Sequence, residues 1–377
     1  MADPADHTYM ARALQLAARG LYSTDPNPRV GCVIVRGGVI VGEGWHCRAG
    51  EHHAEVFALR EAGERARGAT VYVTLEPCAH HGRTPPCSEA LLAAGVQRVV
   101  AAMRDPNPRV AGQGLAQLCQ RGITVECGLM QAQAERLNPG FVRRMMQGRP
   151  WVRCKLAMSL DGRTALANGA SQWITGEAAR ADVQHWRARS SAVMTGIGTV
   201  LADDPAFTVR LPSSVWAQQG CGGEIRQPLR VVMDSRLRTP CDALLLQQPG
   251  ETLIFAAGED ADAAARLTAA GAALESAPAP DGRVDLGAAL ARLAQRGVNE
   301  VWVEAGPALC GALLRANLVD EVILYVAPLL MGTAARGLFD LPAYAALSEC
   351  VALRVDDIRA VGEDWRIIAA VAPRQLQ

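Results

Sequence analysis

The chain has 377 residues, half of them hydrophobic and a fifth charged, which is typical of a globular protein with more than one domain. Its formal net charge is zero, which argues against a nucleic-acid backbone as the main partner, because such partners select a basic excess. Eleven scattered cysteines and the absence of a signal peptide predict reduced thiols in the cytoplasm, and no apolar run reaches the roughly 18 residues of a membrane span.

The first part of the chain alternates helix and strand patterns. Apolar residues at helical spacing predict a helix over 8–21, and the segments 30–35 and 39–45 flank Arg36-Gly37-Gly38, which is typical of a tight hairpin. Further strands are expected at 69–75, 96–102 and 123–126. Further helices are expected at 55–65, 89–94, 114–121 and 128–147, the last interrupted near Pro139. This alternation predicts an α/β sandwich.

The hexapeptide Asp-Pro-Asn-Pro-Arg-Val occurs twice in this part, at 25–30 and 105–110. The repeat is too short to mark a duplicated domain. Its prolines hold the asparagine in an extended, rigid loop, which suits a side chain that presents a fixed amide to a ligand. Two ordinary turns explain the repeat equally well, so the sequence leaves both interpretations open.

The stretch from His53 to Cys87 carries the residue types of a metal centre. His53 precedes Glu55 by two residues, and eight residues separate Cys78 from Cys87. One imidazole and two thiolates are three of the four ligands of tetrahedral zinc, which leaves the fourth position for water. Glu55 is not needed as a ligand and can move a proton between that water and a leaving amine. The pattern is that of the zinc deaminases, although the cysteines are usually two residues apart.

A closed structural zinc clip is the alternative interpretation of these residues. It needs a fourth protein ligand, which His80, His81 or Cys47 could supply. A clip gives no reason for Glu55, so the catalytic interpretation is favoured.

Composition changes near Gln147-Gly148-Arg149-Pro150, and we place the domain boundary there, with domains at 1–147 and 148–377. Helices are predicted between the strands of the second domain, for instance around 178–188 and 261–270. The strands themselves are predicted at 151–157, 192–195, 229–233, 253–256, 301–304 and 321–326. The second domain is therefore also α/β.

Two glycine-containing turns follow strands in the second domain, at 196–199 and 304–307. Such turns let backbone N–H groups approach a phosphate, and two of them on one sheet suit a cofactor with a diphosphate. Leu201 occupies the place of the third glycine of the dinucleotide fingerprint, which weakens the case for a standard Rossmann site. Taken alone, the turns are equally well ordinary loops between strand and helix.

Charged and aromatic residues lie between these turns or shortly before them. Arg187, Arg189 and Arg210 could bind an anionic substrate, and a polar segment at 161–175 carries Trp173. Taken singly, each arginine is better explained as solvated surface and Trp173 as core packing. Only their joint occurrence favours a ligand site.

In combination, the motifs of both halves resemble the bifunctional deaminase/reductase family of bacterial riboflavin biosynthesis. The resemblance covers essentially the whole chain. It rests on HAE (53–55), PCAHHGRTPPC (77–87), both DPNPRV loops, SLDGRTA (159–165), SQWIT (171–175), TVLADDPAFTVR (199–210) and VEAGP (303–307). It implies a cytidine-deaminase-like N-terminal domain followed by a dihydrofolate-reductase-like C-terminal domain. The second fold accounts for the missing Rossmann fingerprint.

The resemblance also implies a role for each matching residue. In the deaminase domain, His53, Cys78 and Cys87 would bind zinc, Glu55 would be the proton shuttle, and the substrate would contact Asn27, His46, His80 and Arg83. NADPH would contact Ala157, Trp173, Thr199, Asp203, Ser235, Gly306, Pro307, Ala308, Leu309, Cys310, Gly311 and Ala312. The reductase substrate would contact Lys155, Ser171, Arg187, Phe207, Arg210 and Glu304.

The implied activity is the deamination of 2,5-diamino-6-(5-phosphoribosylamino)pyrimidin-4-one, followed by NADPH-dependent reduction of its ribosyl group to ribityl. The expected partner is this small phosphorylated pyrimidine, without nucleic acid or membrane, and the chain is expected to form a homo-oligomer. A nucleic-acid base deaminase is one rival, but it predicts a basic, aromatic-rich surface, and this neutral chain has 5% aromatic residues. A zinc-stabilised nucleotide sensor is the other, and it predicts that Glu55 is dispensable.

Overall fold

Two compact units make up the chain in a computed structural model that describes residues 4–79, 86–108, 110–218 and 225–372. The first unit contains the described residues up to Gly148 together with helix α9 (Ser213–Gln218). The second contains Arg149–Leu211 and the described residues from Ile225 onward. Trp216 of α9 stacks on Tyr22 of the first unit, with the ring centroids 6.3 Å apart.

The first unit is built on a five-stranded sheet with the order β2-β1-β3-β4-β5. β1 runs antiparallel to both of its neighbours, whereas β3, β4 and β5 are parallel to one another. The predicted hairpin and strands are confirmed, with β3 and β4 shorter than expected. The strands are β1 (Gly31–Arg36), β2 (Val39–Trp45), β3 (Thr70–Val73), β4 (Arg98–Ala101) and β5 (Thr124–Cys127).

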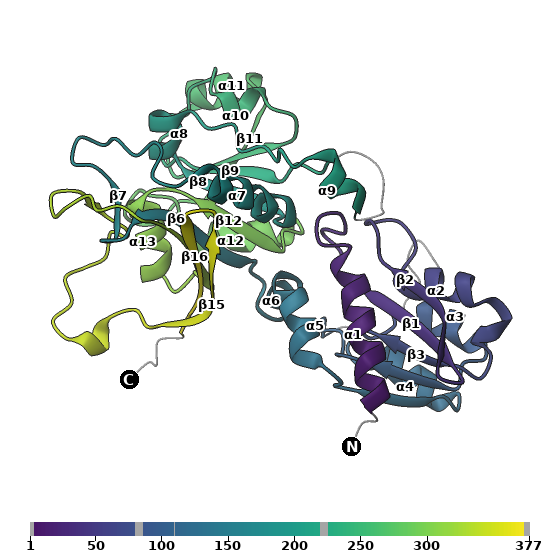
Figure 1. Cartoon of the computed structure of the whole chain (residues 1–377). Helices are drawn as coiled ribbons and strands as arrows, with labels where there is room; N and C mark the ends of the chain where they lie inside the picture. Colours follow the sequence, from purple (N-terminus) through teal and green to yellow (C-terminus); the bar gives the residue numbers. More distant parts are fainter. Residues whose placement is uncertain (1–3, 80–85, 109, 219–224, 373–377) are drawn as a thin grey trace. The chain divides into compact units, whose positions relative to one another are not determined.

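Helices cover both faces of this sheet (Figure 1). Gly44 of β2 lies against α2, because a Cβ atom on this glycine would fall 2.2 Å from the carbonyl oxygen of Ala54. Gly31 of β1 lies against α1, because a Cβ atom there would fall 2.0 Å from the carbonyl oxygen of Ala13. Gly44 pairs with the residue after Gly31, and successive residues of a strand face opposite ways, so α1 and α2 pack on opposite faces. The helices are α1 (Pro4–Ala18), α2 (Ala54–Ala62), α3 (Cys87–Ala93), α4 (Gln113–Gln120), α5 (Gln131–Leu137) and α6 (Pro139–Gln147), with a 3₁₀ turn at Gly63–Ala66.

The second unit is built on a nine-stranded sheet with the order β11-β10-β9-β8-β12-β6-β13-β16-β15. Neighbours from β11 to β13 are parallel, and β13, β16 and β15 are antiparallel. The strands are β6 (Trp151–Ser159), β8 (Ala192–Gly196), β9 (Leu229–Met233), β10 (Thr252–Ala256), β11 (Ala272–Ser276), β12 (Glu300–Glu304), β13 (Glu321–Ala327), β15 (Leu353–Val361) and β16 (Asp364–Val371). A separate small sheet pairs β7 (Arg163–Ala165) with β14 (Arg336–Gly337).

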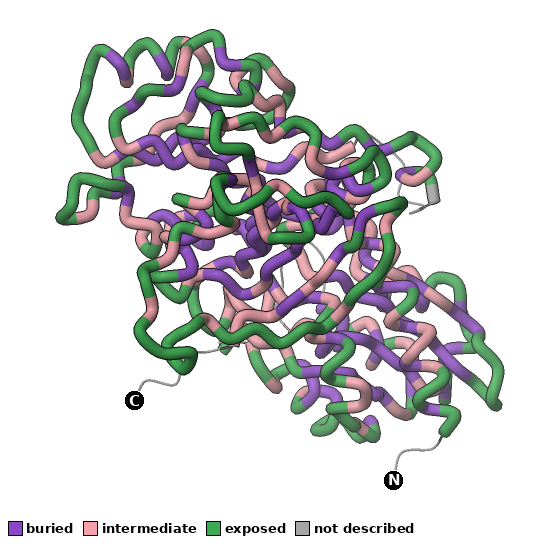
Figure 2. Tube along the Cα trace, turned by 60° about the vertical axis from the view of Figure 1, so that its left-hand side comes forward, coloured by how far each residue is buried: buried purple, intermediate pink, exposed green. Residues whose placement is uncertain are grey.

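The helices of the second unit also lie on both faces of its sheet. Trp186 of α7 stacks on Trp302 of β12 at 5.4 Å between ring centroids, whereas Val301 and Val303 of the same strand join the core on the side of α12 and α13. Buried residues follow the strands in each unit (Figure 2). The helices are α7 (Glu177–Arg189), α8 (Ile197–Asp203), α10 (Leu244–Gln247), α11 (Ala261–Ala269), α12 (Leu286–Gln295) and α13 (Pro307–Arg315), with a 3₁₀ turn at Leu347–Glu349. Among the helices within the described ranges, none has the length and apolar character needed to cross a bilayer.

Candidate active sites

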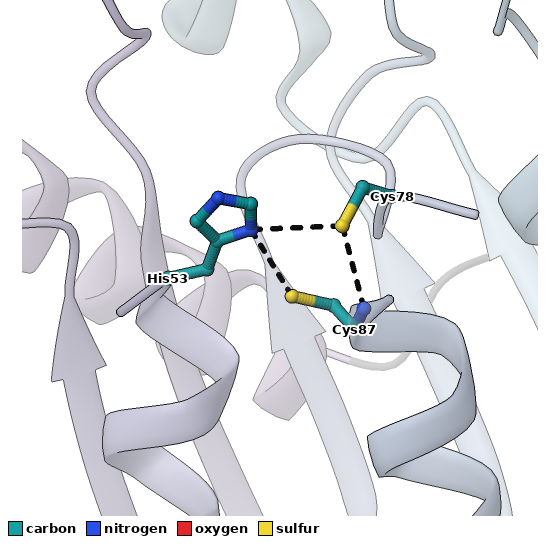
Figure 3. A group of neighbouring side chains, drawn as sticks. All are labelled: His53, Cys78 and Cys87. Atoms are coloured by element: carbon teal, nitrogen blue, oxygen red, sulfur yellow. Dashed lines mark hydrogen bonds between the residues drawn. The ribbon is translucent and has the colours of Figure 1, made fainter. Parts of the chain in front are cut away.

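The first unit brings the three predicted zinc ligands together (Figure 3). His53 caps the N-terminus of α2, Cys78 follows β3, and Cys87 is the first residue of α3. Their ligand atoms lie within 4.8 Å of one another, with His53 Nδ1 3.2 Å from Cys87 Sγ and 3.6 Å from Cys78 Sγ. Zinc bonds of about 2.0 Å to nitrogen and 2.3 Å to sulfur at a tetrahedral angle separate these ligands by about 3.5 Å, which lies between the two distances. The three side chains therefore fit zinc.

The surroundings of Cys78 favour the thiolate that zinc binds. The thiol of Cys87 and then the ring of His53 lower the pKa of Cys78 well below the usual value of a thiol, against the opposing effect of burial. The backbone N–H of Cys87 also donates to Cys78 Sγ over 3.3 Å. The hydrogen bond with Cys78 and burial raise the pKa of Cys87, so the two thiols share a proton that a metal would have to displace.

The closed zinc clip requires a fourth ligand. In the part of the chain that the structure describes, the cluster holds His53, Cys78 and Cys87, and Cys47 is not among its members. His80 and His81 lie outside the described residues.

Glu55 lies beside this cluster in the first turn of α2 and is 3% exposed. Burial raises its pKa above the ordinary value of a glutamate, and the nearby His53 opposes that shift. A carboxyl group with a raised pKa holds its proton to higher pH than an exposed one, which suits it to both accept and donate a proton during a reaction.

A cavity of about 250 Å³ opens beside the cluster, and both copies of the hexapeptide line it. The first copy contributes Asn27, and the second contributes Asn107, which was not among the predicted site residues although the repeat was the signal that could have found it. Asn27 Nδ2 donates to His46 Nε2 over 3.0 Å, and His46 Nδ1 donates to the carbonyl oxygen of His52 over 3.0 Å. Burial lowers the pKa of His46, which favours the neutral ring that this pairing requires.

An apolar wall completes the cavity. Phe141 and Met145, one turn apart on α6, also line it. His80 and Arg83, the other predicted substrate contacts of the deaminase, lie outside the described residues.

In the second unit, two predicted substrate contacts are bound to each other. Arg187 donates to both carboxylate oxygens of Glu304, over 2.5 and 2.9 Å, and Trp302 Nε1 donates to the same carboxylate over 2.9 Å. Arg187 also donates to the carbonyl oxygen of Thr208 over 3.1 Å and lies 5.4 Å from the ring of Phe207. Burial opposes the ionisation of Glu304, yet Arg187 holds its pKa below the ordinary range. Arg187 is therefore a fixed, charge-paired part of the site.

Lys155 lies on β6 near this pair. Burial lowers the pKa of Lys155, the Glu304 carboxylate opposes that shift, and Arg187 adds to it. Its Nζ lies 6.0 Å from the ring centroid of Tyr325 on the neighbouring strand. This lysine releases its proton more readily than an exposed one.

The two glycine turns come side by side at the carboxyl ends of β8 and β12, which pair with each other. Gly196 caps α8 and Gly306 caps α13, and Thr195 Oγ1 donates to the carbonyl oxygen of Glu304 over 2.8 Å between them. The first N–H groups of a helix have no partner within it and can bind phosphate oxygens. The turns therefore provide backbone donors at one edge of the sheet.

Two family descriptions match the chain. Residues 4–103, which include all three predicted zinc ligands, match the cytidine and deoxycytidylate deaminase zinc-binding region, and residues 150–367 match the RibD C-terminal domain. The riboflavin biosynthesis protein RibD of Escherichia coli (strain K12) is 53% identical over 365 residues, which are 95% of this chain and 97% of that protein. The chain belongs to the RibD family.

Other RibD proteins are similar over their whole length. The Haemophilus influenzae protein is 48% identical over 366 residues, which are 96% of this chain and 96% of that protein. The structure of Acinetobacter baumannii RibD superposes with a TM-score of 0.90 at 45% identity, covering 98% of this chain and 99% of the other. A Thermotoga maritima enzyme, described as a diaminohydroxyphosphoribosylaminopyrimidine deaminase/5-amino-6-(5-phosphoribosylamino)uracil reductase, has a TM-score of 0.83 at 30% identity with the same coverage.

Membership of the RibD family confirms the predicted fold and the predicted class of enzyme. A cytidine-deaminase-like domain with a zinc-binding region is followed by a reductase domain of dihydrofolate-reductase-like fold. The chain is a bifunctional enzyme of riboflavin biosynthesis, a deaminase and a reductase in one polypeptide.

Of the other predicted contacts of the RibD reductase site, Trp173 lines a cavity that includes neither glycine turn. Trp173 is 71% exposed, lines a cavity of about 400 Å³ and has the guanidinium of Arg180 4.7 Å from its ring. Gln172, next to Ser171, donates to the exposed Asp203 of α8 over 3.3 Å, which joins this loop to the helix that carries Thr199. Core packing, which was the simpler interpretation of Trp173 in the sequence, is therefore wrong.

Some of the other predicted contact residues already form hydrogen bonds or core contacts within the protein. Ser235 Oγ accepts from the backbone N–H of Val284 over 3.1 Å, which leaves its hydroxyl proton available. Cys310 and Gly311 face the core from α13, so only their main chain could meet a ligand. Arg210 is exposed, and Ala157 lies two residues from Lys155 on β6.

Proposed function

We propose that the first domain deaminates 2,5-diamino-6-(5-phosphoribosylamino)pyrimidin-4-one and that the second reduces the ribosyl group of the product with NADPH. The observation that carries the proposal is the cluster of His53, Cys78 and Cys87 with the buried Glu55 at a cavity edged by asparagine amides. The description of the Thermotoga maritima relative supports the choice of substrate.

In the deamination, water replaces the amino group of the pyrimidine and ammonia leaves. Zinc, when bound by the His53, Cys78 and Cys87 side chains, supplies the Lewis acid that activates water. Glu55 takes up the proton of the attacking water on its carboxylate and returns it to the departing amine. Asn27 and His46, with His80 and Arg83, bind the substrate.

In the reduction, NADPH supplies the hydride that converts the open-chain ribosyl group to ribityl. The N–H groups of Ala308 and Leu309 at the start of α13 bind a phosphate of the cofactor, because Pro307 has no N–H and that of Cys310 donates to Gly306 over 3.3 Å. The other cofactor contacts are Ala157, Trp173, Thr199, Asp203, Ser235, Gly311 and Ala312.

The substrate of the reductase meets a polar wall on the same edge of the sheet. Lys155 provides a positive charge, and the Arg187–Glu304 ion pair beside it holds a guanidinium and a carboxylate in fixed positions. Ser171, Phe207 and Arg210 complete the proposed contacts. Since Arg187 is already paired, Arg210 is the better candidate for the substrate phosphate.

Incubation of the purified protein with the pyrimidine substrate, followed by mass spectrometry, tests the proposal. Without NADPH we expect only the exchange of an amino group for oxygen, with release of ammonia. With NADPH we expect in addition the gain of two hydrogens. An unchanged substrate in both reactions would refute the proposed substrate.

We also propose that the chain forms a homo-oligomer through the β15–β16 hairpin. β15 is an edge strand of the nine-stranded sheet, and Val355, Ile358 and Trp365 of this hairpin are more than half exposed at 53%, 56% and 51%. Apolar side chains on a sheet edge favour pairing with another chain. Light scattering should give a mass that is a multiple of 40.0 kDa, and a monomer would contradict the proposal.

We place the enzyme in the cytoplasm. Its cysteines include the zinc-ligand candidates and the buried thiols of Cys32, Cys154 and Cys310, all of which must remain reduced to keep these environments. Localisation of the tagged protein outside the cytoplasm would contradict this placement.

A further inference from the structure

The second Asp-Pro-Asn-Pro-Arg-Val loop is held by a buried carboxylate from another segment. Glu76, 5% exposed, accepts four backbone hydrogen bonds: Oε2 from the N–H groups of Asp105 and Gly112 over 3.1 and 2.9 Å, and Oε1 from those of Gly114 and Leu115 over 2.9 and 3.3 Å. A carboxylate offers about four lone-pair positions. The backbone uses all of them, so the carboxylate has none left for a substrate although it lines the cavity.

Glu76 thereby joins three parts of the deaminase site. It lies two residues before the predicted zinc ligand Cys78, and it binds the start of the loop that carries Asn107. It also binds the first turn of α4, which approaches so closely that a Cβ atom at Gly114 would fall 1.9 Å from the carbonyl oxygen of Pro77. One side chain therefore fixes the loop relative to the strand end that carries the metal ligand.

The first copy of the loop is held in a similar way by Asn138. This residue is 3% exposed and lies between α5 and α6. Its Oδ1 accepts from the backbone N–H of Arg29 over 2.8 Å and its Nδ2 donates to the carbonyl oxygen of Arg29 over 2.9 Å. The Arg29 guanidinium in turn donates to the carbonyl oxygen of Leu137 over 2.8 Å. Asn138 thus binds the loop that carries Asn27 with the pair of bonds that a neighbouring strand would form.

We propose that Glu76 and Asn138 are positioning residues of the deaminase, which together set the separation of the Asn27 and Asn107 amides across the cavity. The inference rests on the function proposed above. Because neither side chain takes part in proton transfer, their loss acts on substrate binding and leaves the chemical step and the metal in place.

Two variants remove these bonds while nearly keeping the shape of the side chain. Glu76→Gln keeps one oxygen, which can accept two of the four bonds, and turns an amide donor against the other two backbone donors, whereas Asn138→Leu removes both bonds to Arg29. For each variant we expect the deaminase KM to rise about tenfold, equivalent to about 1.4 kcal/mol of binding free energy, with kcat and zinc content close to those of the unchanged chain. NADPH oxidation with the deaminated intermediate is the internal control and should not change.

Asp6→Asn is the matched control for a general loss of stability. Asp6 is an equally buried carboxylate of the same domain, 4% exposed, that accepts from Arg98 over 2.9 and 2.7 Å and from Tyr72 over 2.5 Å. It is not among the cavity residues. We expect this variant to lower the melting temperature without raising KM.

Amide hydrogen exchange tests the same inference without substrate. Glu76→Gln should speed exchange at one of the two pairs of N–H groups that the carboxylate binds, Asp105 with Gly112 or Gly114 with Leu115, while Arg29 stays protected. Asn138→Leu should speed exchange at Arg29 and leave those four protected. An unchanged KM in a chain that deaminates, loss of zinc, or exchange that rises in both loops alike would overturn the inference. If the unchanged chain does not deaminate the pyrimidine, the proposed function fails, and the exchange pattern alone decides whether the two residues position the loops.

Discussion

Glu55 combines burial with a position beside the three zinc-ligand side chains, and glutamine would keep its size but could not move a proton. We expect Glu55→Gln to lower the rate of ammonia release by about 10² to 10⁴-fold. NADPH oxidation should be unchanged when the deaminated intermediate is supplied, because the proposed cofactor contacts all lie in the second domain. Assays of ammonia and of NADPH absorbance measure the two steps. A nucleotide sensor would instead tolerate the substitution.

Lys155 provides a pH test of the reductase. Burial lowers its pKa from the usual 10.5. The side chain is positively charged below its pKa, so as the pH rises it loses this charge earlier than an exposed lysine does. Because the substrate contact depends on this charge, we expect kcat/KM for the reduction to fall on the alkaline limb of its pH profile, where Lys155 becomes neutral. Lys155→Met should lower the plateau and remove the limb. An identical limb in the variant would assign it to another group.

Arg187 and Arg210 should respond differently to replacement by alanine. Arg210 is exposed, so Arg210→Ala should weaken substrate roughly ten- to a hundredfold, the loss expected for a charge-assisted contact, and leave NADPH binding and stability unchanged. Arg187→Ala should also lower the melting temperature, because it leaves the carboxylate of Glu304 buried without its partner. Substrate titration, cofactor titration and thermal melts separate the two outcomes. Equal weakening of both ligands by Arg210→Ala would indicate a cofactor role.

At the scale of secondary-structure elements, the deaminase site is made by the ends of α2, β3 and α3. Each element contributes one ligand, so we expect roughly one zinc per chain in the purified protein. The double variant Cys78→Ser/Cys87→Ser should contain almost none, whereas Cys127→Ser, which changes an exposed thiol, should retain it. Elemental analysis measures the content, and unchanged zinc in the double variant would refute the ligand assignment.

Local patterns predicted these elements well where apolar residues alternate or run together, as in β6, β8, β12 and β13. The same reasoning missed β15, because it is exposed along most of its length and its register shifts between Val355 and Asp357, which breaks the alternation. The motif residues of the zinc cluster were predicted because they lie within one short stretch of sequence. The Arg187–Glu304 pair was not predicted, since its members are 117 residues apart and only the packing of α7 on the sheet brings them together.

At the scale of the whole molecule, two chemistries in two domains allow a complementation experiment. Trp173→Ala should stop the conversion at the deaminated ribosylamine, and Glu55→Gln should stop it before that step. We expect a mixture of the two variants to form the final ribityl product, because the intermediate released by one chain can be reduced by another. Mass spectrometry of the mixture measures the outcome. If neither variant rescues the other, the intermediate must be converted within a single chain.

The close contact of β2 with α2 has a consequence for metal affinity. Gly44 meets the carbonyl oxygen of Ala54, which directly follows His53 and directly precedes Glu55. One methyl group at this glycine would press on the main chain that orients both side chains. We therefore expect Gly44→Ala to weaken zinc binding although residue 44 has no ligand atom, and a metal-buffered titration should register this packing change on the neighbouring strand as a larger dissociation constant.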